Sequence, residues 1–266
     1  MKKVVVITGA SSGIGLVAGK YLVEKGYKVY GLSRTEINDN TIIHIPCDVT
    51  NQEQVRKAFA AIDENIYAVI NNAGIGISGP FEYESRDEIM RIINVNIIGV
   101  VNICQLAIPY LRKTKGKIIN IGSVAADFVI PFQLFYSLTK AALQTITEGL
   151  RLELKPFGIS VTTILPGDTK TSFTANRIKN VIVDDVYGMR AINSIHKMEE
   201  DEKKGKDPIS VARVIAKVLK RKNPPIKVTV GCSYKILIFL KRIFPLKFIS
   251  YILYKMYGGN KSGSQS

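Results

Sequence analysis

The chain has 266 residues, of which 46% are hydrophobic and 22% are charged. This composition is typical of a globular protein with its own core, and it excludes wholesale disorder. No run reaches the roughly 18 apolar residues of a membrane-spanning helix, so we expect a cytoplasmic protein. Three scattered cysteines and two distant histidines predict neither a disulfide framework nor a metal site.

The charge is strongly basic and unevenly distributed. The net charge is +15, and residues 208–266 contain twelve Lys or Arg and no Asp or Glu. This asymmetry indicates an anionic partner, such as lipid headgroups, an acidic substrate or carrier, or nucleic acid. A basic surface that only promotes solubility is the alternative. Nucleic acid is not expected, because the basic residues lie among aliphatic residues and tyrosines without a nucleic-acid-binding module.

Apolar strands alternate with helices along most of the chain. The predicted strands are 3–8, 27–32, 41–45, 67–70, 117–121, 159–165 and 227–230. The predicted helices are 16–25, 52–62, 86–111, 135–155 and 210–222. Strands this apolar, joined by helices, predict a sheet covered on both faces. The expected fold is therefore α/β: a single-domain, Rossmann-like, doubly wound parallel sheet of about seven strands.

Three segments follow from this pattern: a catalytic domain over 1–232, a C-terminal extension over 233–257 and a flexible tail over 258–266. Within the domain, residues 168–207 are polar and are predicted to be irregular. A segment of this length is typical of a substrate-binding loop or lid. The tail is rich in Gly, Ser and Asn and is expected to be loose.

A glycine-rich segment, 8–15, joins the first predicted strand to the first predicted helix. Glycines let the backbone turn tightly and approach a phosphate closely, and the helix N-terminus offers free N–H groups. Its place after the opening strand predicts a site for a dinucleotide pyrophosphate. The candidate residues are Gly9, Ser11, Ser12, Gly13, Ile14 and Gly15.

The second predicted strand ends in Ser33 and Arg34. NAD-binding sheets of this kind tend to place a carboxylate here for the ribose 2′-hydroxyl. A guanidinium beside a hydroxyl suits a 2′-phosphate instead. The sequence therefore favours NADP(H) over NAD(H), with a solvated loop arginine as the alternative.

A tyrosine and a lysine stand four residues apart, at Tyr136 and Lys140, with Ser123 earlier in the chain. In a helix the first two share one face. A phenol has a reference pKa of about 10, and a nearby ammonium favours the phenolate, which suits acid/base work. Ser123 follows the fifth predicted strand, at the sheet edge where ligands bind.

Together these motifs resemble the short-chain dehydrogenase/reductase family over nearly the whole chain. The matching residues, in order, are Thr8 to Gly15, Asn71 to Gly74, Asn96, Ser123, Tyr136 with Lys140, and Pro166–Gly167 with Thr171. One departure is that the helix usual after the second strand is missing. The adenine end is therefore expected to be open.

The resemblance implies a role for each matched residue. Tyr136 would donate a proton in ketone reduction and accept one in alcohol oxidation, while Lys140 would lower its pKa and bind the nicotinamide ribose. Ser123 would orient the substrate oxygen, and Asn96 would hold a helix kink and a water. Further cofactor contacts are implied for Asp48, Val49, Asn72, Ala73, Gly74, Pro166, Gly167, Thr169 and Thr171.

The C-terminal extension predicts an amphipathic helix that begins near Pro245. Its apolar face comprises Leu246, Phe248, Ile249, Ile252, Leu253 and Met256. Peripheral contact with an anionic membrane through 235–257 is one interpretation, and a cover over an apolar substrate site is another. Docking onto the protein's own core or onto a second subunit is the third. The long helices at about 88–111 and 135–155 resemble those that pair subunits in the family, so a homodimer or homotetramer is expected.

These features predict an NADP(H)-dependent oxidoreductase that transfers a hydride between nicotinamide and a lipophilic ketone, such as a steroid. A reductase of 3-oxoacyl thioesters on an acidic carrier protein or coenzyme A is the alternative enzyme. A catalytically idle cofactor-binding or membrane-associated sensor is the alternative outside enzymes, although the complete Ser123, Tyr136 and Lys140 set argues against it.

Overall fold

The computed structural model describes residues 2–181 and 186–258. Its core is a seven-stranded, all-parallel sheet in the order β3-β2-β1-β4-β6-β7-β9. The strands are β1 Val4–Thr8, β2 Lys28–Ser33, β3 Ile43–Pro46, β4 Ile66–Asn71, β6 Lys117–Ile121, β7 Ser160–Leu165 and β9 Lys227–Thr229. A separate parallel pair consists of β5 Ile77–Ser78 and β8 Ile178–Lys179. The expected doubly wound α/β sheet of about seven strands is confirmed.

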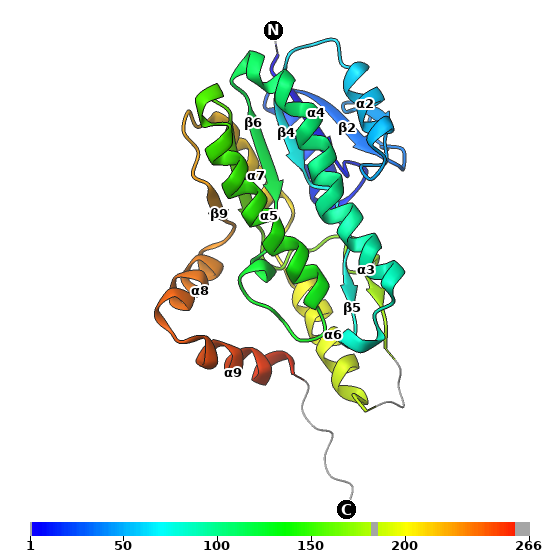
Figure 1. Ribbon diagram of the computed structural model, residues 1–266, viewed down its shortest axis with the longest axis vertical. Coiled ribbons are helices and arrows are strands. Elements are labelled where there is room, and N and C mark those ends of the chain that lie inside the picture. The colour runs from blue at the N-terminus through cyan, green and yellow to red at the C-terminus, as the bar shows by residue number, and fades with distance from the viewer. Residues whose placement is uncertain (1, 182–185, 259–266) are drawn as a thin grey trace, which may run out of the picture.

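Helices cover both faces of the sheet, as Figure 1 shows. They are α1 Gly13–Glu24, α2 Gln52–Ala60, α3 Arg86–Ile93, α4 Gly99–Thr114, α5 Leu134–Glu153, α6 Met189–Lys203, α7 Ile209–Lys220, α8 Cys232–Ile243 and α9 Leu246–Tyr257. Helices α1 and α7 pack together on one face, over a core of side chains from β1 and β4. Helices α2, α4 and α5 cover the other face, over a second core. Each strand therefore contributes apolar residues on both sides, which explains the near-continuous apolar runs.

No helix separates β2 from β3 in the described chain, as the sequence predicted. The expected long helix over 86–111 is present but interrupted: five residues of π-helix, Asn94–Ile98, lie between α3 and α4. Such an insertion commonly bends a helix at a functional site.

One stretch of the described chain, Arg86–Thr114, is long and apolar enough to cross a membrane by length and composition alone. The sequence expectation that no such stretch exists was therefore wrong. Residues 92–111 lack charge but contain Asn and Gln, which interrupt the apolar run. In the fold, α4 packs against β4 and α2.

The prediction of an irregular segment over 168–207 was also wrong in part. Helix α6 occupies Met189–Lys203, and β8 pairs with β5. The charged residues that suggested a loop instead form ion pairs along and across α6. Those pairs are Lys197–Asp201, Lys204–Glu200, Arg177–Glu202 and Lys179–Glu199.

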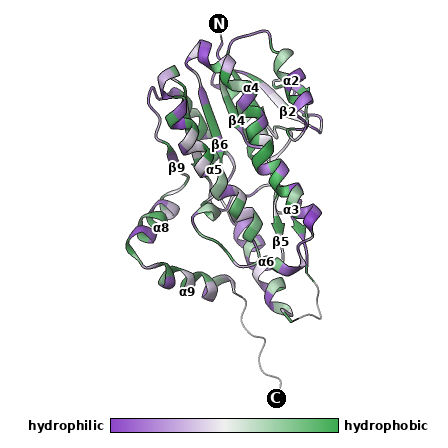
Figure 2. Cartoon of the chain, in the orientation of Figure 1, coloured by the Kyte–Doolittle hydropathy of each residue, from purple (hydrophilic) through white to green (hydrophobic). Residues whose placement is uncertain are grey.

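The C-terminal extension folds as two helices, α8 and α9, joined at Pro245, so the helix expected after Pro245 is confirmed. Figure 1 shows this pair projecting beside the sheet, with α9 near α6. Both helices carry hydrophobic as well as hydrophilic residues (Figure 2). The predicted flexible tail, 258–266, lies outside the described residues apart from Gly258.

Candidate active site

A continuous pocket of about 810 Å³ lies at the carboxyl ends of the sheet strands. Strand order reverses between β1 and β4, and ligands of open α/β sheets bind at such a point. Most of the predicted site residues line it: Gly9, Ser11, Ser12, Gly13, Ile14, Ser33, Arg34, Asp48, Val49, Asn72, Ala73, Gly74, Ser123, Tyr136, Lys140, Pro166, Gly167, Thr169 and Thr171. Gly15 and Asn96 are the two that do not.

The start of α1 has the properties of a phosphate site. Gly13 has φ +53°, a left-handed conformation that favours glycine. A Cβ on Gly15 would lie 2.2 Å from the carbonyl oxygen of Gly9, so only glycine lets the loop close here. The cap residue Ser12 makes no side-chain cap hydrogen bond, and the first turn has no acidic residue. The helix end is thus open to an anion, and these residues fit a dinucleotide cofactor.

The segment after β4 is tied to this loop by hydrogen bonds. The Asn72 side chain donates to the carbonyl oxygens of Thr8 (3.0 Å) and Gly9 (3.1 Å). The backbone N–H groups of Asn72 and Ala73 both donate to the Thr8 hydroxyl, at 3.0 Å. Asn72 therefore fixes the shape of the glycine loop from the neighbouring strand.

The opposite end of the pocket holds Ser33, Arg34 and Asp48. Arg34 is exposed at the rim, and Ser33 is buried with its hydroxyl donating to the carbonyl oxygen of Thr35 at 2.7 Å. Asp48 accepts hydrogen bonds from the backbone N–H (2.9 Å) and hydroxyl (2.7 Å) of Thr50. The guanidinium is thus free to meet an anionic group at the open end of the pocket.

Tyr136 and Lys140 lie one turn apart on α5. The ammonium of Lys140 lies 5.6 Å from the centroid of the Tyr136 ring and donates to the carbonyl oxygen of Ile121 at 2.9 Å. Ser123 follows β6 and caps a short turn by accepting from the N–H of Ala125 at 3.1 Å. The fold thus brings the three predicted catalytic side chains to one wall of the pocket.

Burial is the largest influence on the pKa values of Tyr136 and Lys140. It raises the pKa of Tyr136 to about 12, while hydrogen bonding with Ser123 acts in the opposite direction. Burial also lowers the pKa of Lys140 to about 8. The sequence predicted that Lys140 lowers the Tyr136 pKa, whereas the pKa is raised and desolvation is the main cause, so the phenol is protonated at neutral pH.

Asn96 lies in the π-helix and is fully buried. Its amide donates to the Thr139 hydroxyl and to the carbonyl oxygen of Ile75, both at 3.0 Å, and accepts from the N–H of Ile75 at 2.9 Å. Asn96 therefore joins the helix bend to the pocket wall and to α5 without reaching the pocket itself.

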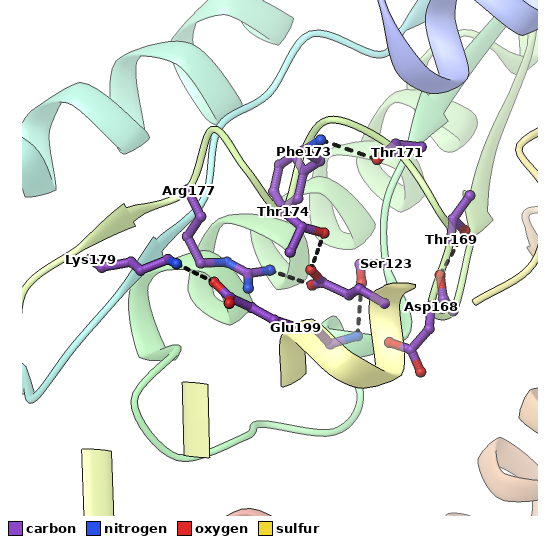
Figure 3. Close-up of polar contacts among 12 residues, drawn as sticks. Ser123, Asp168, Thr169, Thr171, Phe173, Thr174, Arg177, Lys179 and Glu199 are labelled. Atoms are coloured by element: carbon purple, nitrogen blue, oxygen red, sulfur yellow. Dashed lines mark hydrogen bonds and ion pairs between the residues drawn. The ribbon is translucent and has the colours of Figure 1, made fainter. Parts of the chain in front are cut away.

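A polar cluster beside Tyr136 was not found by sequence reasoning. Arg177 is buried and pairs with Glu202, which also accepts from the Thr174 hydroxyl at 2.5 Å (Figure 3). The Phe173 ring lies 5.5 Å from the Tyr136 ring, centroid to centroid. Nothing in the sequence marked these residues, because the pairing joins α6 to a segment 25 residues earlier.

The C-terminal helices form the remaining wall of the pocket. Their contribution is almost entirely apolar: Tyr234, Leu237, Leu240, Phe244, Phe248, Ile249, Ile252, Leu253, Met256 and Tyr257. Of the three interpretations of the extension, the structure thus favours a cover over an apolar part of the site.

Comparison with known proteins agrees with this geometry. Residues 3–181 match the family model for short chain dehydrogenase. The chain is 38% identical over 242 residues to a 3-ketodihydrosphingosine reductase of Bacteroides thetaiotaomicron, covering 88% of this chain and 90% of that protein. The protein belongs to the short-chain dehydrogenase/reductase family, and it is an oxidoreductase acting on the CH–OH/C=O pair.

Solved structures share the fold. A short-chain dehydrogenase of Streptomyces avermitilis superposes with a TM-score of 0.81 at 24% identity, covering 96% of each chain. A structure titled ElxO with NADP bound has a TM-score of 0.73 at 26% identity, covering 89% of this chain and all of that one. A Brucella melitensis 3-ketoacyl-(acyl-carrier-protein) reductase complexed with NADH has a TM-score of 0.72 at 23% identity, covering 86% of this chain and 96% of that one. The last two of these structures contain a nicotinamide cofactor.

Proposed function

We propose that this protein is an NADP(H)-dependent reductase of a ketone carried on a long apolar chain, of the 3-ketodihydrosphingosine class. The observation that carries the proposal is the shape of the pocket. From Ser123 and Tyr136, its lining continues into the apolar side chains of α8 and α9, a wall suited to a hydrocarbon chain. The similarity to the Bacteroides reductase extends over 88% of this chain and 90% of that protein.

The chemistry assigned to the site is reduction of C=O to CH–OH. A nicotinamide cofactor bound along the pocket supplies the hydride. Ser123 and Tyr136 hold the ketone oxygen by hydrogen bonds, and the Tyr136 phenol donates its proton to that oxygen as the negative charge develops. Lys140 lies close enough to favour the phenolate that is left, and it binds the ribose of the cofactor. Oriented groups in a preformed pocket provide most of the rate enhancement.

The preference for NADP(H) rests on Arg34. Its guanidinium is exposed at the end of the pocket, and the carboxylate typical of NAD-binding sheets is missing at this position. A bidentate contact with a 2′-phosphate suits this arrangement.

We also propose that the outer surface of α8 and α9 contacts an anionic membrane, from which an apolar substrate can enter. Large apolar side chains are exposed there, namely Ile236, Phe239, Ile243, Leu246, Tyr251 and Tyr254. They are interleaved with the exposed cations Lys235, Arg242, Lys247 and Lys255. Apolar and basic residues on one surface match the acyl boundary and the anionic headgroups of a bilayer.

Vesicle co-sedimentation tests the membrane contact. The double variant Arg242→Glu/Lys247→Glu is expected to reduce binding to vesicles containing phosphatidylglycerol by at least about tenfold. Lys113→Glu, at the exposed end of α4, serves as the control for a charge reversal elsewhere on the surface. Equal binding of the double variant and the wild type to anionic vesicles would exclude this surface as the contact.

Turnover tests the enzymatic proposal. NADPH and NADH are offered in parallel with 3-ketodihydrosphingosine, a steroid ketone and a 3-oxoacyl thioester, and cofactor absorbance is followed. The proposal expects NADPH-linked reduction of the long-chain ketone. Turnover confined to the thioester would favour the 3-oxoacyl reductase, and turnover confined to the steroid would favour a hydroxysteroid dehydrogenase.

A further inference from the structure

Asp168 places a carboxylate in the wall of the pocket. It follows Pro166–Gly167 at the end of β7, is half-buried, and lines the same pocket as Ser123. Figure 3 shows both residues in the same region of the site. Its charge is close enough to Tyr136 to raise the pKa of that phenol. The N–H of Val124 donates to the carbonyl oxygen of Pro166 at 3.0 Å, which holds the segment that leads into Asp168 next to Ser123, on the side of the pocket where the carbonyl group would react.

One oxygen of this carboxylate is held by α8. The Tyr234 hydroxyl donates to Oδ2 of Asp168 at 2.5 Å and accepts from the Asp168 N–H at 3.1 Å. The Tyr234 ring packs so closely on Gly167 that a Cβ there would lie 2.0 Å from it. No described residue donates to the other oxygen, Oδ1, so one face of the carboxylate is available to a ligand.

The other carboxylates of the pocket are already occupied. Both oxygens of Glu202 accept bonds, one from Thr174 and one from Arg177. Asp48 lies at the far, adenine end and is bound by Thr50. Within the described part of the chain, Asp168 is thus the acidic lining residue that keeps an oxygen free near the reacting groups.

The local field favours a cation at this point. The charges acting on Asp168 are those of Asp201 and Glu202, which raise its pKa, and Lys197, which lowers it; burial is the largest influence and also raises it. A half-buried carboxylate among other carboxylates is costly unless a cation compensates it. The carboxylates of Asp168, Asp201 and Glu202 thus form a locally acidic region in a chain whose net charge is +15.

We propose that Asp168 binds the ammonium group of a 2-amino ketone substrate. This inference rests on the proposed function and specifies its substrate class. In 3-ketodihydrosphingosine the amine-bearing carbon is bonded directly to the carbonyl carbon. A carbonyl held by Ser123 and Tyr136 therefore brings the ammonium into the same part of the pocket, where Oδ1 of Asp168 accepts a charge-assisted hydrogen bond.

A purely structural role is the competing explanation, because Asp168 also anchors α8. Two variants separate the two roles. Asp168→Asn removes the charge but keeps an oxygen that accepts from Tyr234. Tyr234→Phe removes the anchoring hydroxyl but keeps the carboxylate.

The experiment compares two ketones of equal chain length, 3-ketodihydrosphingosine and its analogue without the amine. For each variant the readout is the ratio of kcat/KM for the amino ketone to kcat/KM for the deaminated ketone. Asp168→Asn is expected to lower this ratio by about tenfold to a hundredfold, the usual effect of losing a charged hydrogen bond. Tyr234→Phe is expected to change the ratio by less than about threefold. An unchanged ratio in Asp168→Asn overturns the inference.

Failure of the proposed function can be told apart from failure of this inference. If the wild type reduces neither ketone, the amine site is judged by calorimetric binding of a twelve-carbon 2-amino-1,3-diol. Weaker binding to Asp168→Asn than to the wild type supports the site even then. Equal affinity, or no binding to either protein, overturns it.

Discussion

The ammonium nitrogen of Lys140 lies 5.6 Å from the centre of the Tyr136 ring, and the two residues share one face of α5. Their pKa values shift apart, since burial lowers the pKa of Lys140 from 10.5 to about 8 and raises that of Tyr136 from 10.0 to about 12. In the protein without cofactor, burial therefore disfavours both the Lys140 ammonium and the Tyr136 phenolate. The phenol is consequently protonated at neutral pH, as a proton donor must be.

Lys140→Met is expected to remove a pH-dependent cost to stability. The folded-state pKa of Lys140 is about 8 against 10.5 for the ordinary group, so the unfolded chain binds more protons between these values. The destabilisation caused by burying the Lys140 ammonium is greatest below about pH 8 and decreases as the pH rises toward 10.5. The free energy of unfolding of the wild type is therefore expected to gain up to about 3 kcal/mol relative to Lys140→Met over that interval.

Denaturant unfolding of both proteins at pH 7.5 and pH 10.5 measures this difference. Because other titrating groups are shared, their effects cancel in the comparison. A constant difference between the two proteins across the interval would show that Lys140 keeps an ordinary pKa in the folded state. Turnover of Lys140→Met is expected to be lost in any case.

Arg34→Ala is expected to weaken use of NADPH selectively. Loss of a charged hydrogen bond to the 2′-phosphate corresponds to about a tenfold to hundredfold rise in KM for NADPH. The KM for NADH is expected to stay within about threefold, since no phosphate is present at that position. Arg56→Ala, at an exposed arginine paired with Glu53, is the matched control. An equal effect on both cofactors would contradict the assignment.

Glu202→Gln is expected to destabilise the fold. Arg177 has no exposed side-chain surface and pairs with Glu202, so the variant leaves a buried guanidinium without its counter-charge. The expected loss is about 3 kcal/mol in the free energy of unfolding. Glu200→Gln removes an exposed pair with Lys204 on the same helix and is expected to cost less than about 0.5 kcal/mol. Equal denaturant midpoints for the two variants would show that the buried pair contributes nothing.

Gly15→Ala is expected to abolish cofactor binding. Its Cβ would lie 2.2 Å from the Gly9 carbonyl oxygen and 2.5 Å from the Asn72 amide nitrogen, so the loop must open. Titration of NADPH with the protein, followed by the fluorescence of the reduced cofactor, measures the affinity. Gly149→Ala, on α5 with nothing within 4 Å of the added carbon, is the control. Wild-type affinity in Gly15→Ala would contradict the close packing of this loop.

Much of the fold could be predicted from the sequence because its signals are local. Continuous apolar strands, a glycine-rich turn and the Tyr136–Lys140 spacing each depend on nearby residues. The same holds for the missing helix after β2. The pocket then follows from parallel topology, because the carboxyl ends of the strands meet at one edge.

The remaining features depend on contacts between distant segments. Helix α6 was missed because its charges are satisfied by residues outside it, such as Arg177 and Lys179. The hydrogen bond between Tyr234 and Asp168 joins residues 66 positions apart, so no local sequence pattern predicts it. Burial is also the main cause of the raised Tyr136 pKa. It results from tertiary packing, which the Tyr136–Lys140 spacing in the sequence does not reveal.

The central claim is tested most directly by the rate of 3-ketodihydrosphingosine reduction by Tyr136→Phe, with NADPH affinity measured on the same sample. The account predicts that kcat falls by about 100-fold or more, the usual contribution of a positioned proton donor, while cofactor affinity is retained. Near-normal turnover by a variant that binds NADPH as the wild type does would contradict it.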